Sequence, residues 1–248
     1  MSRSNPNLNA PHPAVRWFEW NGEAGTVRYF DKDAKKYVGV PLPFSYLLLD
    51  ELAGVRGWHD ASKSGIYSNE VRDTTKDVLL VKAFKGGMLA EGLYRGLKDR
   101  INALGGQFVS NCYIASKLNS NELSSIASMR FKGAALGAWM EFRKAHRGAL
   151  YEKAIQITGY IEGKKGRIVF RAPTFDLKDV SADSNAQALA LDRELQVWLD
   201  GDLKRKTRDQ ADASPDEVER DSYNGGGEAD EPGSYGVCAP LTDEDIPF

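Results

Sequence analysis

A change of composition near residue 204 limits where this chain can fold. From there to residue 248, Gly, Asp, Glu, Ser and Pro dominate and apolar residues become scarce. Such a segment cannot bury enough apolar surface to offset its conformational entropy, so it is expected to be disordered. The start, residues 1–13, is polar, contains three prolines and is also expected to be disordered. The folded domain is therefore predicted within residues 14–203, with residues 204–248 as a disordered acidic tail.

The charges are divided in the same way as the composition. Residues 207–248 contain twelve acidic and two basic side chains, a net charge of −10, whereas residues 1–206 carry +8. The net charge of −2 for the whole chain conceals this asymmetry. A basic domain followed by an acidic tail is typical of proteins that bind nucleic acids or other polyanions. A flexible linker from 207 to 242 would extend about 35 Å on average, enough for the tail to reach the domain.

Alternating apolar residues and turn signals predict a mainly β domain with a few helices. Asn21-Gly22 is a strong hairpin signal between the first two strands. The expected strands cover 15–20, 25–30, 37–42, 44–58, 66–73, 78–85, 107–117, 123–131, 150–161 and 167–175. Apolar residues at helical spacing predict helices over 88–104, 134–145 and 185–199.

Between residues 44 and 131 the expected order is three strands, a helix and two strands. This is the order of an OB-fold, a five-stranded Greek-key barrel that often binds oligonucleotides. Other mixed folds share the order, and the hairpins at 15–42 and 150–175 would be additions to a minimal barrel. We therefore expect an OB-fold-like five-stranded barrel with extra hairpins and helices.

The last six residues combine three acids with an apolar end: Asp243, Glu244, Asp245, Ile246, Pro247 and Phe248. Adjacent like charges favour a solvated segment, and Pro247 stiffens it. A partner with a hydrophobic socket and a basic rim would suit the Phe248 ring, the acids and the terminal carboxylate, since carboxylate capture is a recurring mode of peptide recognition.

This ending resembles that of the bacterial single-stranded DNA-binding protein family, whose acidic tail closes in Asp-Ile-Pro-Phe. The match covers Asp245 to Phe248 and does not extend to the domain. With the predicted barrel, the whole chain resembles a bacteriophage-encoded single-stranded DNA-binding protein. The resemblance implies binding and protection of single-stranded DNA with little sequence preference, and recruitment of replication or repair proteins by the tail.

Sequence-tolerant binding of single strands needs aromatic faces for the bases and cations for the phosphates. Strand alternation selects positions where the two occur together, with Tyr113 and Lys117 ranked first. Core packing is the competing expectation for each ring, and a solvated surface charge for each cation. The predicted nucleic-acid-binding residues are Trp58, Tyr67, Lys82, Phe84, Tyr113, Lys117 and Arg130.

The sequence contains no motif for enzyme chemistry. The three histidines lack metal-ligand spacing, the two cysteines form no zinc pair, and the phosphate-loop pattern fails at Gly159 and Gly163. We therefore expect no catalytic residues, metal or cofactor. A nuclease using Asp50, Glu51 and His59-Asp60 is one alternative, and an interaction adaptor acting only through its tail is another.

The expected location is the cytoplasm, of the host cell if the chain is phage-encoded. Cys112 and Cys238 form no paired motif, which favours a reducing compartment. No apolar run approaches the roughly 20 residues needed to span a bilayer.

Overall fold

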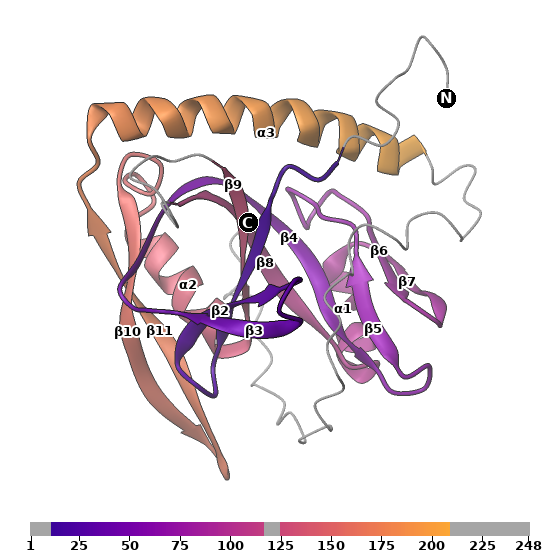
Figure 1. Cartoon of the computed structure of the whole chain (residues 1–248). Helices are drawn as coiled ribbons and strands as arrows, with labels where there is room; N and C mark the ends of the chain where they lie inside the picture. The colour runs from indigo at the N-terminus through magenta and orange to yellow at the C-terminus, as the bar shows by residue number, and fades with distance from the viewer. Residues whose placement is uncertain (1–10, 117–124, 209–248) are drawn as a thin grey trace.

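The computed structural model describes residues 11–116 and 125–208, with residues 202–208 described by backbone alone. The predicted lead 1–13 is therefore described only from residue 11. Within these residues the chain forms eleven strands and three helices (Figure 1), which are β1 Arg16–Asn21, β2 Thr26–Asp31, β3 Lys36–Val40, β4 Phe44–His59, β5 Ser64–Ser68, β6 Leu79–Ala83, β7 Gly87–Gly92, α1 Tyr94–Ala103, β8 Gly106–Ala115, β9 Ile126–Lys132, α2 Gly133–Ala145, β10 Ala154–Lys165, β11 Ile168–Lys178 and α3 Ala182–Arg208.

All described strands belong to one sheet, so the expectation of a mainly β protein with few helices is confirmed. The strand order is β3-β2-β1-β9-β8-β4-β5-β6-β7, with β10 paired to the start of β4 and β11 to β10. β1 and β9 run parallel, and the other described ladders are antiparallel. The sheet is open, and the predicted five-stranded barrel over residues 44–131 is not confirmed.

The long strand β4 holds the sheet together. Its first residues pair with β10, its middle pairs with β8 and its end pairs with β5. β4 needs a glycine where it passes the residue before β8: a Cβ on Gly57 would lie 2.2 Å from the carbonyl oxygen of Gly105. The glycine that interrupts the predicted strand is therefore required by backbone packing, since no larger residue fits there.

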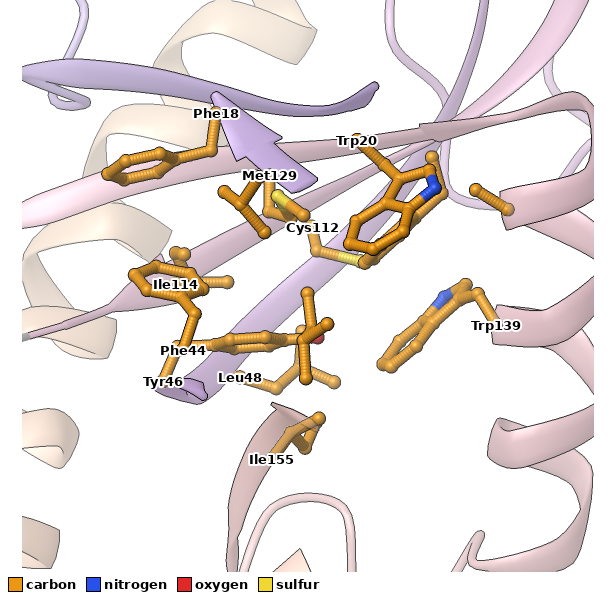
Figure 2. Packing of buried hydrophobic residues seen from close by; sticks show 14 of the residues in the cluster. Phe18, Trp20, Phe44, Tyr46, Leu48, Cys112, Ile114, Met129, Trp139 and Ile155 are labelled. Atoms are coloured by element: carbon orange, nitrogen blue, oxygen red, sulfur yellow. The ribbon is translucent and has the colours of Figure 1, made fainter. Parts of the chain in front are cut away.

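The two faces of the sheet are covered differently. We call the side bearing Cys112 and Ile114 the inner face; its largest core includes Phe18, Trp20, Tyr46 and Trp139 (Figure 2). In Figure 2 the Trp139 ring from α2 points toward the side chains of the strands. Helix α1 covers a second core on the same face, built from β4 to β7 and including Val55, Leu79 and Ile101.

The opposite side, which carries Tyr113, is the outer face. Helix α3 lies across part of it (Figure 1) and buries Ala188, Leu195 and Leu199 against β4, β8 and β9. These residues recur at helical spacing and form the apolar stripe that anchors the helix. The helix runs 27 residues, well beyond the predicted 185–199.

The prediction of one helix over residues 88–104 is wrong. Residues Gly87–Gly92 form strand β7, and α1 begins only at Tyr94. Gly92 has a φ of +145°, which breaks the segment between strand and helix. Leu89 packs into the α1 core from the strand, so its apolar character belongs to β7 and not to a helical stripe. No helix in the described ranges is both long and apolar enough to cross a membrane.

Candidate nucleic-acid interface

Three adjacent strands bring four of the predicted binding residues onto one part of the outer face. Arg56 of β4 lies opposite Tyr67 of β5, and Tyr67 lies opposite Lys82 of β6. Trp58 and Phe84 continue the alternation on the same side. We call this group the β4–β6 patch; its residues are Arg56, Trp58, Tyr67, Lys82 and Phe84.

The rings of the patch keep surface available to solvent. Trp58 is 42% exposed, and Tyr67 and Phe84 are each partly exposed. The Tyr67 and Phe84 ring centroids lie 5.0 Å apart with their planes at 49°. This contact restrains both rings, so a base stacking on them would find them already positioned.

The cations of the patch lie beside these rings. The Arg56 side chain donates from Nη1 to the Ser68 carbonyl oxygen at 3.2 Å, which holds the guanidinium against β5. Among the described residues, no carboxylate lies within ion-pair distance of Lys82, although its side chain is partly buried by its neighbours. A partly desolvated ammonium next to aromatic faces favours an anionic ligand that also presents flat rings.

Arg130 lies apart from the patch. It is on β9, where its Nε donates to Asn111 Oδ1 at 3.1 Å, and it lies opposite Glu19 of β1. Glu19 is paired with Arg28 at 2.8 Å, and the described residues place no carboxylate within ion-pair distance of Arg130 itself. Arg130 therefore adds positive charge to the same face of the sheet, several strands away from the patch.

Tyr113, ranked first from the sequence, cannot stack on a base in this structure. It is 1% exposed and lies in the core between the sheet and α3. Its hydroxyl donates to Glu70 Oε2 at 2.7 Å, and the His12 ring stacks 5.8 Å from its own ring. Strand alternation placed the residue on the correct face, but α3 covers that face. Lys117 lies outside the described residues, as do the tail residues Asp243, Glu244, Asp245, Ile246, Pro247 and Phe248.

The carboxylates considered for a nuclease site point to opposite faces. Asp50 lies on the outer face and accepts from Arg72 at 2.7 Å and from Gln196 at 3.0 Å. Glu51 lies on the inner face and pairs with Arg143 at 2.7 Å. His59 Nδ1 lies 2.7 Å from the Ser62 hydroxyl. These side chains do not converge, and within the described ranges no group of three or more His, Cys, Asp or Glu could hold a metal ion.

The one cysteine in the described part of the chain, Cys112, is fully buried. Burial, and secondarily the Glu51 carboxylate, raises the pKa of its thiol well above the ordinary value. A nucleophilic cysteine needs the opposite shift, because the thiolate is the reactive form. Cys112 is therefore a packing residue of the inner core.

Sequence reasoning missed Arg56, although a signal for it was present. It lies two residues before Trp58 in the predicted strand 44–58, so alternation puts both side chains on one face.

Comparisons with known proteins give this chain no relative. No protein-family model matches it, and neither a curated protein nor a solved structure matches it significantly. The residues of the chain therefore carry the functional argument.

Proposed function

We propose that this protein binds single-stranded DNA with little sequence preference and coats it, using the β4–β6 patch as a principal contact. The observation that carries the proposal is the patch itself: three partly exposed rings and two cations on one face of three adjacent strands. Rings accept any base because every base has a π-face, and each stacked base contributes about 1–3 kcal/mol.

The architecture that we propose for the domain is an enlarged, open relative of the OB-fold. Strands β1, β9, β8, β4 and β10 surround the inner core. Two hydrogen bonds join β11 to the β1–β2 turn. Trp20 Nε1 donates to the Arg171 carbonyl oxygen at 2.7 Å, and the Arg171 amide donates to the Gly22 carbonyl oxygen at 2.8 Å. A five-stranded, partly open barrel of this kind would suit oligonucleotide binding.

We further propose that the acidic segment ending in Asp-Ile-Pro-Phe recruits proteins of replication, recombination or repair. Its support is the resemblance of Asp245 to Phe248 to the bacterial family's ending and the strong negative charge of residues 207–248. In this proposal the domain holds the DNA and the tail contacts the partner proteins inside a phage-infected cell.

The proposal is tested by measuring fluorescence anisotropy of a labelled 30-nucleotide oligo(dT) across salt, beside a duplex of the same length. We expect tight binding of the single strand, weaker binding of the duplex, and affinity that falls steeply with salt as counterions are released. An oligo(U) of the same length compares RNA with DNA. If the protein binds neither single strand, the adaptor function through the tail replaces this proposal.

Deleting residues 209–248 should strengthen binding at low salt. The deleted segment carries twelve acidic residues against one basic residue, and these charges compete with phosphates for the basic domain. Because the Debye length is about 30 Å at 0.01 M salt but about 10 Å at 0.1 M, we expect a several-fold gain near 0.01 M that shrinks toward 0.3 M. Anisotropy titrations of both proteins at several salt concentrations measure it, and equal affinities at low salt would refute the competition.

A further inference from the structure

The long hairpin of β10 and β11 extends well beyond the rest of the sheet (Figure 1), and its far end has an unusual surface. We call residues 160–172 the ribbon. The pairs from Ile161–Ala172 to Lys165–Ile168 form its outer part, about 17 Å long at 3.4 Å per residue. This part exposes apolar side chains: Ile161 is 67% exposed, Val169 45% and Ile168 41%.

The base of the ribbon is fixed to the domain through Arg171. Its amide and carbonyl groups bond to Gly22 and to the Trp20 indole, and its guanidinium donates to the Glu23 carbonyl oxygen. Arg171 also pairs with Glu162 at 3.2 Å, so the single carboxylate of residues 160–172 is neutralised. The ribbon beyond this point is therefore held by its base and carries a formal charge of +3 from Lys164, Lys165 and Arg167.

One aromatic ring is positioned on the side of the ribbon that faces away from this anchor. Phe170 lies opposite Gly163, and a Cβ on Gly163 would be 2.5 Å from Cζ of the ring. The ring therefore lies over the glycine, which has no side chain to displace it. Because Phe170 alternates with Arg171, it points to the side opposite the β1–β2 turn, where Ile161 and Ile168 flank it.

We propose that the ribbon is a second contact for the single strand, with phosphates at the basic tip and a base on Phe170; this inference rests on the proposed function. A face two strands wide and about 17 Å long is too small for the roughly 1,200 Å² that a stable protein interface buries, which argues against a second copy of the chain as its occupant. A single polynucleotide strand needs only a narrow surface of rings and cations. At the base of the hairpin this side reaches the start of β4, where the Gln156 side chain donates to the Ser45 hydroxyl at 2.8 Å.

The test uses the full chain with the triple variant Lys165→Glu/Arg167→Glu/Phe170→Ala and a 30-nucleotide oligo(dT), because Lys165 lies on the same side of the ribbon as Phe170. Loss of two phosphate contacts should lower the slope of log affinity against log salt by about 1.4, and we expect affinity at 0.1 M salt to fall at least tenfold. The matched control is Arg95→Glu/Arg100→Glu/Tyr151→Ala, with the same changes of charge and ring on exposed residues elsewhere. We expect it to stay within twofold of the wild type.

Because removing the Phe170 ring could loosen the hairpin, the double variant Lys165→Glu/Arg167→Glu keeps the ring and should by itself lower the salt slope by the same amount. The inference fails if both ribbon variants bind like the control while Tyr67→Ala/Lys82→Glu in the patch still weakens binding. It also fails if sedimentation shows that the ribbon variants change the oligomeric state, which would assign the surface to a second copy. If the wild type itself binds no oligonucleotide, the proposed function fails first.

Discussion

The double variant Tyr67→Ala/Lys82→Glu should bind a 30-nucleotide oligo(dT) about 10- to 100-fold more weakly than the wild type at 0.1 M salt. Tyr67 would lose one stacked base, worth about 1–3 kcal/mol, and its support of the Phe84 ring at 5.0 Å. Lys82 would lose one phosphate contact, which lowers the salt slope by about 0.7. Anisotropy titrations between 0.05 and 0.3 M salt measure both quantities.

The control for this variant is Tyr151→Ala/Lys144→Glu, which makes the same chemical changes at two exposed positions, one in the last turn of α2 and one after it. Its affinity should stay within twofold of the wild type. Urea unfolding of both variants checks that each remains folded. If the two variants weaken binding to the same small extent, the β4–β6 patch is not where the strand binds.

Glu51→Gln should lower the free energy of unfolding by about 3 kcal/mol, the typical cost of leaving one member of a buried ion pair without its partner. The Glu51 carboxylate accepts from Ser110 at 2.7 Å, from the Trp139 indole at 3.1 Å and from Arg143 at 2.7 Å. It thereby joins α2 to β4 and β8 while only 11% of its side chain is exposed. An amide at this position keeps the size but removes the charge that Arg143 requires. Urea unfolding monitored by tryptophan fluorescence measures the change.

Glu141→Gln is the matched control, since Glu141 lies on α2 but is exposed to solvent. We expect it to change the free energy of unfolding by less than about 0.5 kcal/mol. If the two variants were equally stable, Glu51 would not hold α2 to the sheet, and the hypothesis that this carboxylate serves a nuclease would be open again.

The sequence predicted elements that depend on local patterns. Asn21-Gly22 identified the first hairpin, and alternation placed Lys82 and Phe84 on one face of the predicted strand 78–85, because turn chemistry and a period of two are local properties. It failed where the deciding contact came from a distant segment. Tyr113 shares the outer face with the patch, but Leu195 and Leu199, more than 80 residues later, cover it. No pattern around Tyr113 contains that information.

The same limit explains the ribbon and the open sheet. The basic turn after Ile161 was visible in the sequence, yet its distance from the domain depends on how Arg171 bonds to Trp20 and Gly22, about 150 residues earlier. The order of strands over residues 44–131 suggested a closed barrel. In the structure β9 pairs with β1, a strand from outside this range, and the expected strands do not close on one another. Order along the chain does not determine which strands pair.

Ultraviolet cross-linking of the full chain to oligo(dT), followed by mass spectrometry of the linked peptides, shows which side chains touch the bases. Cross-linking joins a thymine to a ring in contact with it. The account predicts links to the peptides containing Trp58, Tyr67 and Phe84, reduced in Tyr67→Ala/Lys82→Glu. Links confined to the side of the sheet that α1 covers, or to Tyr113 with none in the β4–β6 patch, would contradict it.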